Sequence, residues 1–398
     1  MHLHSSERAL IQLLASVPLL YYVLASLASL RFFTRERRRA APSFTPQVSL
    51  LKPVRGVDFA SYENFASFCR QDYPDYEILF AVSDEHDQAL PVIQRLIAEF
   101  PARRIRILVG APQLGANKKV NKLVRLAQEA QHEILVMTDG DVRVGPNYLR
   151  EVVAPFADSS TGAVTSFYRA VAQPNLGAEL EAVGASSDFF AGVLMAEWLE
   201  GVSFALGASV VSTKTWLRKI GGLEPIANML SDDYEIGHRI AEAGGKVVLS
   251  REPVWTMYPA QSFSGFWNHQ VRWARTVRLC RPLSYVGLLF THGLPWAVLA
   301  AAVAHTRAGA AAFLGAYLAL RLIMAYIVGV WGIGDAVLRR RLYLVPLRDA
   351  IHFVVWLASF ASNRVVWHGT SFAADHGHLV ALGSSAAADS AAAAHASR

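Results

Sequence analysis

The chain has 398 residues, 53% of them hydrophobic, and a formal net charge of +6. This apolar content is higher than that of an average soluble domain, and only two cysteines are present, which excludes a disulfide framework or a cysteine-based zinc site. Much of the basic charge flanks apolar segments near the two ends, so it indicates contact with membrane headgroups and gives no ground for inferring nucleic-acid binding.

The first predicted element is an apolar helix over residues 9–30, which is long enough to span a bilayer. A basic run follows it at 31–39. A cleaved signal peptide carries its charges before the apolar run, so this order predicts an uncleaved anchor. The positive-inside rule then puts the N-terminus outside and the next domain in the cytosol. We therefore interpret residues 1–40 as an N-terminal transmembrane anchor with a basic flank.

Strands and helices then alternate through a domain that we place at residues 41–261. Such alternation predicts βαβ units, a mostly parallel sheet and an α/β, Rossmann-like domain. After residue 160 the pattern is less regular. Predicted strands lie at 48–51, 77–82, 104–109, 134–137, 163–167 and 246–249, and predicted helices at 62–71, 89–100, 118–131, 175–199 (one helix or two) and 234–243.

The C-terminal part is predicted to contact the membrane. Aromatic and basic residues interleave over 262–283, which suits an amphipathic helix at the membrane surface; a packed helix with a solvated charged face fits the periodicity equally well. We expect three transmembrane helices within 284–368, at about 285–304, 308–331 and 344–367. The Ala- and Ser-rich tail, 369–398, is expected to be disordered.

Three charged residues, Arg321, Arg348 and Asp349, lie within or at the ends of these apolar segments. Charge inside a bilayer is costly, so each is a hypothesis for a functional site or for helix pairing. Arg348 and Asp349 also fit a position at the interface.

Acidic residues recur at the predicted strand and loop ends. The strand at 134–137 leads into Asp139-Gly140-Asp141, and in open α/β sheets ligands bind beyond the carboxyl ends of strands. Two carboxylates on a tight turn suit Mg²⁺ or Mn²⁺ carrying a diphosphate. A plain polar turn would explain a lone Asp-Gly-Asp, but Asp84 and the Asp232-Asp233 pair occupy comparable positions.

These acids suggest a division of chemistry. Asp84 could bind a base or ribose, and Asp232 or Asp233 could accept a proton from an attacking hydroxyl. Arg272 has the planar fork that matches phosphate oxygens.

At this point the chain resembles the family-2-like inverting glycosyltransferases, and most closely the ceramide glucosyltransferase family (family 21). The resemblance covers residues 50–278. The matching stretches are Lys52-Pro53-Val54-Arg55-Gly56, Val82-Ser83-Asp84, Asn117-Lys118-Lys119-Val120-Asn121, Asp139-Gly140-Asp141-Val142, Gly221-Gly222-Leu223, Asp232-Asp233-Tyr234 and Arg272-Trp273.

The resemblance implies a GT-A glycosyltransferase fold that uses a UDP-sugar, a divalent cation (Mg²⁺ or Mn²⁺) and a lipid acceptor. It implies that Asp233 is the catalytic base and that Asp139 and Asp141 hold the metal. It also implies a role in nucleotide-sugar binding for Asp84, Lys119, Asn121, Asp139, Arg272 and Trp273, although a solvated helix start would equally explain Lys119 and Asn121.

Two departures from the family pattern leave the acceptor open. His269 stands at the first position of the (Q/R)xxRW motif, with Gln270 one place late, and Asp141 completes a fuller Asp-x-Asp. Both suggest a bacterial branch, with Asp232 and His269 on the acceptor or donor side.

The expected function is therefore hexose transfer from UDP-glucose to ceramide by a multi-pass protein of the inner (plasma) membrane, with its catalytic domain in the cytoplasm. The alternatives are transfer of N-acetylglucosamine from its UDP form to bacteriohopanetetrol in hopanoid synthesis, and a processive polysaccharide synthase. A non-catalytic membrane scaffold is a further class. The short C-terminal membrane part argues against the synthase, and the intact aspartate motifs argue against the scaffold.

Overall fold

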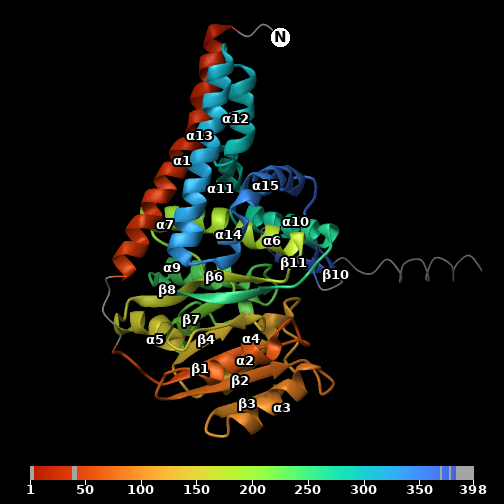
Figure 1. The fold of residues 1–398 in the computed structure, drawn as a ribbon. Helices are drawn as coiled ribbons and strands as arrows, with labels where there is room; N and C mark the ends of the chain where they lie inside the picture. The colour runs from red at the N-terminus through yellow and green to blue at the C-terminus, as the bar shows by residue number, and fades with distance from the viewer. Residues whose placement is uncertain (1–3, 38–42, 368–369, 376–377, 382–398) are drawn as a thin grey trace, which may run out of the picture.

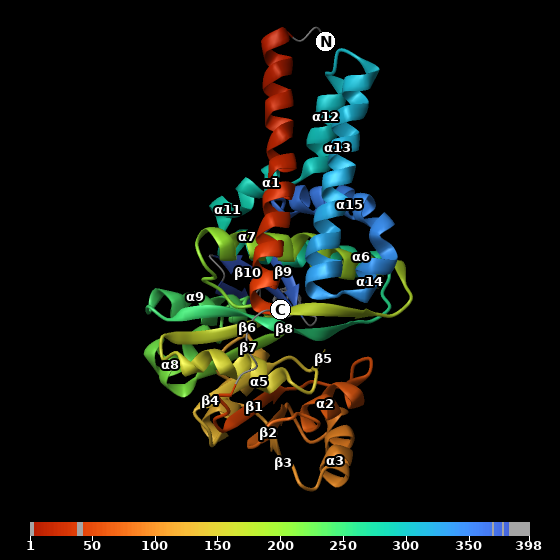
Figure 2. The same cartoon turned by 60° about the vertical axis from the view of Figure 1, so that its left-hand side comes forward.

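The computed structural model describes residues 4–37, 43–367, 370–375 and 378–381. Its elements form three layers: an α/β domain, a layer of helices that lies across the top of that domain, and a bundle of long helices that rises from this layer (Figures 1 and 2).

An eight-stranded mixed sheet organises the α/β domain, in the order β3-β2-β1-β4-β7-β6-β8-β5. The first four of these strands are parallel, β7 runs antiparallel to both neighbours, and β6 and β8 are parallel. This arrangement confirms the predicted α/β fold class. The strands are β1 (Val48–Pro53), β2 (Tyr76–Val82), β3 (Arg104–Val109), β4 (Ile134–Thr138), β5 (Val142–Arg143), β6 (Thr161–Ala172), β7 (Ser209–Thr213) and β8 (Lys246–Tyr258).

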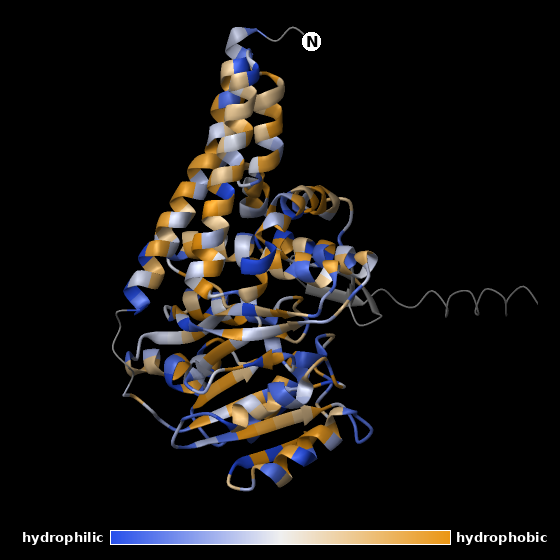
Figure 3. Cartoon of the chain, viewed as in Figure 1, coloured by the Kyte–Doolittle hydropathy of each residue, from blue (hydrophilic) through white to orange (hydrophobic). Residues whose placement is uncertain are grey.

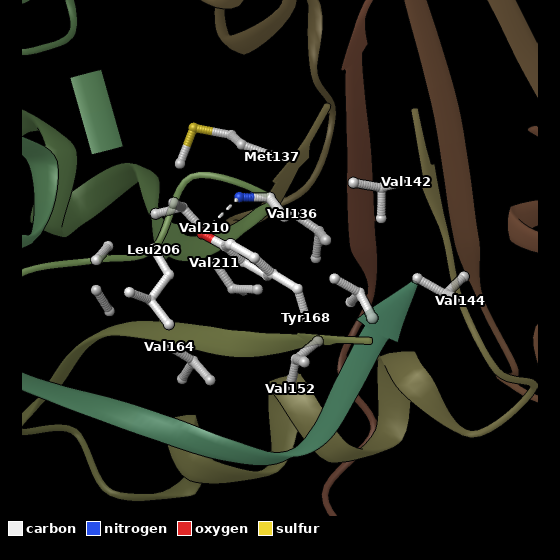
Figure 4. Packing of buried hydrophobic residues seen from close by; sticks show 14 of the residues in the cluster. Val136, Met137, Val142, Val144, Val152, Val164, Tyr168, Leu206, Val210 and Val211 are labelled. Carbon is white, nitrogen blue, oxygen red and sulfur yellow. Dashed lines mark hydrogen bonds between the residues drawn. The ribbon is translucent and has the colours of Figure 1, made fainter. Parts of the chain in front are cut away.

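The central strands are almost wholly apolar because helices cover both of their faces, and every residue of β1, β2 and β4 is buried. Figure 4 shows the Tyr168 ring of β6 among valines from β4, β6 and β7. The helices of this domain are α2 (Ser61–Cys69), α3 (Ala89–Glu99), α4 (Lys118–Glu129), α5 (Tyr148–Val153), α8 (Lys214–Lys219) and α9 (Asp232–Glu242).

The long bundle consists of α1 (Ser5–Arg37), α12 (Gly293–Ala302) and α13 (Arg307–Ala325), which continues as a π-helix over Tyr326–Ile333. Tyr22 ties α1 to the start of α12, because its hydroxyl accepts a hydrogen bond of 2.9 Å from the Gly293 N–H. Figure 3 shows the predominantly hydrophobic colouring of this bundle.

Three helical segments of the described chain are long and apolar enough to cross a membrane: Ser5–Arg37, Arg307–Ile333 and Ala336–Ser359. A bent pair, Pro282–Phe290 with Gly293–Ala302, would make a fourth. These segments include the predicted anchor and the three predicted C-terminal segments.

The layer between domain and bundle contains α6 (Leu176–Gly184), α7 (Phe190–Leu199), α10 (Phe263–Cys280), α11 (Pro282–Gly287), α14 (Ala336–Arg341) and α15 (Val345–Ser359). A π-helical turn, Ala185–Phe189, joins α6 to α7. The segment 262–283 thus forms a helix where an interfacial helix was predicted. In both views α15 runs across the base of the bundle rather than along it (Figures 1 and 2).

The C-terminal predictions need two corrections. The last apolar helix ends at Ser359 rather than at 367, and Arg364–Trp367 forms β9. The tail is not disordered throughout, because β10 (Thr370–Asp375) and β11 (His378–Ala381) complete a three-stranded antiparallel sheet with β9. Phe372 is buried in this sheet, which an isolated polar tail would not achieve. The rest of the predicted tail, 382–398, lies outside the described residues.

Candidate functional site

The acidic motifs meet at the carboxyl ends of the central strands, around the side chain of Lys119. Its Nζ lies 2.7 Å from Asp139 Oδ1 and 3.0 Å from Asp232 Oδ2. Burial alone would lower the pKa of Lys119, but the negative charges of Asp139, Asp232 and Asp233 outweigh burial and raise that pKa well above its usual value. One ammonium group therefore joins the turn after β4 to the start of α9.

The loop before α4 holds Lys119 in place. Asn117 caps α4, and its Oδ1 accepts hydrogen bonds from the Lys119 and Val120 N–H groups at 3.1 and 3.2 Å. Its Nδ2 donates to Asp232 Oδ1 at 3.4 Å. A Cβ added at Gly115 would lie 2.4 Å from the Ala227 carbonyl oxygen, so the loops that precede α4 and α9 press directly against each other.

Asp232 and Asp233 begin α9, where the helix dipole favours negative charge. Ser231 occupies the N-cap position of α9, but its side chain makes no capping hydrogen bond and donates its hydroxyl to Asp233 Oδ1 at 2.7 Å. The other carboxylate oxygen of Asp233 faces Gly207, where an added Cβ would lie 2.9 Å away. Burial, followed by the charge of Asp232, raises the pKa of Asp233 to about 6, with Lys119 acting in the opposite direction. At neutral pH Asp233 is thus a carboxylate with a high proton affinity, as a general base requires.

Lys52, in β1, is a site residue to which the sequence interpretation gave no role of its own. It is fully buried, and its Nζ donates to Thr138 Oγ1 at 3.1 Å and to the Asp139 carbonyl at 2.9 Å. Burial lowers the pKa of Lys52 to about 7, against the attraction of Asp139 and Asp141. The signal that could have identified it is a lysine at the end of a strand that is otherwise apolar.

The Asp139-Gly140-Asp141 turn fits a divalent cation. Burial, followed by the charges of Asp139 and Asp58, raises the pKa of Asp141 to about 7, and this repulsion is what a cation would relieve. No group of three or more His, Cys, Asp or Glu side chains suited to a metal occurs in the described part of the chain. A cation at this turn would therefore have two protein carboxylates and would take its other oxygens from a bound phosphate and water.

Two predicted nucleotide-binding residues lie at the edge of this centre. Asp84 is exposed just beyond β2, two strands from Asp139 across the sheet, and its Oδ1 accepts from the His86 N–H at 2.9 Å. Asn121 donates its Nδ2 to the Gly115 carbonyl at 3.0 Å. Its buried Oδ1 has no hydrogen-bond partner among the described residues, so this acceptor is left for a ligand or water.

The residues predicted on α10 form a second group. His269 Nδ1 lies 2.5 Å from Glu181 Oε1. The centroid of the Trp273 ring is 5.9 Å from the centroids of both the His269 and the Phe189 rings. Burial lowers the pKa of Arg272, with Glu181 opposing. The Arg272 guanidinium makes no hydrogen bond or ion pair with any described residue. The structure does not bring Arg272 into contact with Asp139 or Asp233.

A cavity of about 520 Å³ lies elsewhere, and His132, Ile134 and Trp216 are among its lining residues. Ile134 begins β4, so this cavity adjoins the amino end of that strand. The carboxylates lie at the opposite end, and the cavity therefore does not belong to their site.

The chain matches the family model described as Glycosyl transferase family 21 over residues 10–380. Ceramide glucosyltransferase 1 of Caenorhabditis elegans is 25% identical over 231 residues, which are 58% of this chain and 49% of that protein. The ceramide glucosyltransferase of Candida albicans is 33% identical over 119 residues, or 27% of this chain and 22% of that protein. The chain thus spans at most about half the length of these curated relatives.

Among solved structures, the mannosyltransferase PcManGT from Pyrobaculum calidifontis, in complex with GDP-Man and Mn²⁺, aligns with a TM-score of 0.48 at 18% identity. The alignment covers 87% of this chain and 99% of that one. GalNAc-T7 with UDP, GalNAc and Mn²⁺ aligns with a TM-score of 0.42 at 12% identity, over 60% of this chain and 51% of that one.

Proposed function

Because the chain belongs to glycosyl transferase family 21, we propose that it is an inverting membrane glycosyltransferase that moves a hexose from a UDP-sugar to a lipid hydroxyl. Glucose as the sugar and ceramide as the acceptor are the proposed pair, since the curated relatives are named ceramide glucosyltransferases. The observation that carries the proposal is the Lys119 ammonium, which holds Asp139 and Asp232 in one ion-pair cluster next to the partly buried Asp233.

Asp233 is the proposed general base. It takes the proton of the acceptor hydroxyl as that oxygen bonds to the anomeric carbon, and the bond from that carbon to the β-phosphate oxygen breaks with its electron pair leaving on UDP. Attack from the face opposite UDP inverts the anomeric centre. A partly buried carboxylate with a pKa of about 6 suits this step, because it is ionised at neutral pH and still basic enough to accept the proton.

The donor side of the site is assigned to residues with unused polar groups. The Asn121 Oδ1 and the Arg272 guanidinium are both without partners among the described residues, and Asp84 is exposed at the adjacent strand end. We assign Asp84 and Asn121 to the nucleoside and Arg272 to the diphosphate. Asp139 and Asp141 would hold a Mg²⁺ or Mn²⁺ ion, which supplies positive charge against the departing diphosphate.

The acceptor side is assigned to the helical layer that carries α10, where Trp273 is 39% exposed. A lipid held in the bilayer would reach the site from this layer. The basic run at 31–39 supports a cytosolic position for the α/β domain.

The experiment is a measurement of UDP release by the purified protein in lipid nanodiscs. UDP-glucose and UDP-N-acetylglucosamine are each offered with ceramide or with bacteriohopanetetrol, with and without Mn²⁺, and Asp233→Asn serves as the matched inactive control. Turnover of UDP-glucose only with ceramide supports the proposal. Turnover of the N-acetylglucosamine donor with the hopanoid would replace the proposed substrates. A polymeric product would point to a processive synthase, and release no faster than that of Asp233→Asn with every pair would refute glycosyl transfer to these lipids.

A further inference from the structure

The helix α15 is long and apolar enough, together with α14, to be counted as a membrane crossing, yet it runs across the base of the bundle formed by α1, α12 and α13 (Figures 1 and 2). We propose that α15 lies in the plane of the membrane, within the leaflet next to the α/β domain, and that the chain returns to that same side after α13. This inference concerns the membrane interface and does not rest on the identity of the sugar or the lipid.

The first argument is the parity of crossings. Both neighbours of the C-terminal apolar region are attached to the α/β side of the protein. Before it, α10 follows β8 of the sheet after four residues and packs on α6. After it, the Arg364 carbonyl of β9 accepts a hydrogen bond of 2.7 Å from Arg275 Nη1 of α10. Phe372 of β10 then packs against Leu230, which nearly adjoins Asp232. A chain that leaves this side and returns to it crosses an even number of times. The bent segment from Pro282 to Ala302, which ends in α12, supplies one crossing, and α13 with its π-helical continuation supplies a second. A third crossing by α15 would therefore place β9 on the wrong side.

The second argument is the outward face of α15. Its exposed side chains are Leu347, Val354 and Leu357, which are 46%, 49% and 49% exposed. At 100° per residue these positions fall on one stripe, together with the half-buried Ile351. A helix that shows an apolar stripe to its surroundings and keeps its charges inside is suited to lipid rather than to water.

The third argument is the inward face, which explains the charged residues of this region. Asp349 receives hydrogen bonds of 2.8 to 3.2 Å from the Arg321 guanidinium of α13, and Tyr317 donates to it at 2.8 Å. Arg348 donates to Gln270 of α10 at 2.5 Å. His352 lies 2.7 Å from Asp188, just before α7. These contacts anchor α15 at the level of Arg321 and turn its apolar stripe away from the protein.

The apolar stripe also continues into a neighbouring helix. In α11, Leu283 and Val286 are 88% and 52% exposed, and Tyr285 stacks on Trp356 of α15 with 6.4 Å between ring centroids. The two short helices thus form one apolar surface around the base of the crossing bundle, and the partner that fits it is the acyl region of the adjoining leaflet.

The test compares the depth of two positions on α15 with two on α13. The two native cysteines are first removed by Cys69→Ala and Cys280→Ser, so that only the introduced cysteine reacts. A fluorophore is then attached at Leu347→Cys or at Leu357→Cys. The matched controls are Leu314→Cys and Ile323→Cys, which are exposed positions on the crossing helix α13. The protein is reconstituted in vesicles that contain lipids with a quencher at a shallow or a deep acyl position, and the ratio of shallow to deep quenching is measured.

Leu347 and Leu357 are ten residues apart, or about 15 Å along a helix, and the two α13 positions are separated by about 13 Å. We expect the two α15 positions to give the same quenching ratio, close to that of Ile323, whereas Leu314 is quenched several-fold more by the deep quencher. A difference between the α15 positions as large as that between the α13 positions would overturn the proposal, and so would the absence of quenching at both α15 positions.

A second readout locates the end of the chain. A protease site appended after Arg398 should be cut, in sealed vesicles, from the same side as a site inserted in the exposed loop at Asp84. Cleavage of the two sites from opposite sides would refute the parity argument. Because neither readout uses enzymatic turnover, its outcome is separable from that of the proposed glycosyl transfer.

Discussion

Replacing Gly207 by alanine tests the placement of Asp233 without removing its carboxylate. The added Cβ would lie 2.9 Å from Asp233 Oδ2, and ordinary contacts of this kind are about half an ångström longer, so the carboxylate has to move by about that amount. Misplacement of a catalytic group by about 1 Å costs on the order of 100-fold in rate. For Gly207→Ala we therefore expect kcat to fall by about 10- to 100-fold, or about 1.4–2.8 kcal/mol in activation free energy, with little change in UDP affinity.

The matched control is Gly192→Ala on α7, where an added Cβ meets nothing within 4 Å. Both substitutions are measured by UDP release, by UDP binding and by thermal unfolding in detergent. Gly192→Ala should keep wild-type kcat, and it should stabilise the protein slightly because alanine is the better helix former. A folded Gly207→Ala protein with wild-type kcat would refute the assignment of Asp233 as the group whose position controls the reaction.

Three further predictions address the same assignments. Asp233→Asn should lower kcat by about 10²- to 10⁴-fold with UDP affinity retained. In the wild type, kcat should fall as the pH drops through about 6, because the base must be ionised and burial raises the pKa of Asp233 to that value. A kcat that does not change from pH 5 to 8 would contradict this role. Lys119→Met should lower the free energy of unfolding by about 1–2 kcal/mol, since the ion pairs that it breaks are only partly buried. Mn²⁺ should raise the melting temperature of this variant more than that of the wild type. An equal rise in the two melting temperatures would argue against a cation at Asp139. Arg321→Met should destabilise the protein by about 3–5 kcal/mol, because it leaves the Asp349 carboxylate, whose side chain is only 12% exposed, without its partner. Adding Asp349→Leu should recover part of this loss, and an additive double mutant would rule out the pairing.

Local patterns in the sequence were enough to predict the α/β domain. The apolar run at 134–137, followed by Asp139-Gly140-Asp141, marks a buried strand and the turn after it, because a strand covered on both faces has to be apolar throughout. Asp139 and Lys119 come after β4 and β3, two parallel strands whose carboxyl ends lie at one edge of the sheet. Asp232 begins α9 instead, after the antiparallel β7, so its arrival at this edge depends on the assembled fold. The catalytic and binding roles given to these residues stay predictions.

Other features depend on contacts between distant segments, and no local pattern encodes them. The packing of Gly207 against Asp233 and the bonds of Lys52 to Thr138 require the assembled sheet. The direction of α15 is set by its pairing with α13 and α10, whereas hydropathy reports only length and apolar content. The strands β9 to β11 were missed because short strands of mixed composition form only when a partner surface is already present.

The anchor helix α1 is also part of the hydrophobic core, since Tyr22, Ala25, Phe32 and Phe33 are buried in the same cluster as the central strands. Tyr22 meets its partner Gly293 only after 271 further positions of the chain. At a synthesis rate of roughly 5–20 residues per second, α1 has to wait about 15–50 s in the bilayer before α12 emerges. During this interval its buried face is covered by lipid or by an insertion factor. Deleting the anchor to obtain a soluble enzyme would therefore remove a component of the core, and we expect such a truncation to misfold rather than to detach cleanly from the membrane.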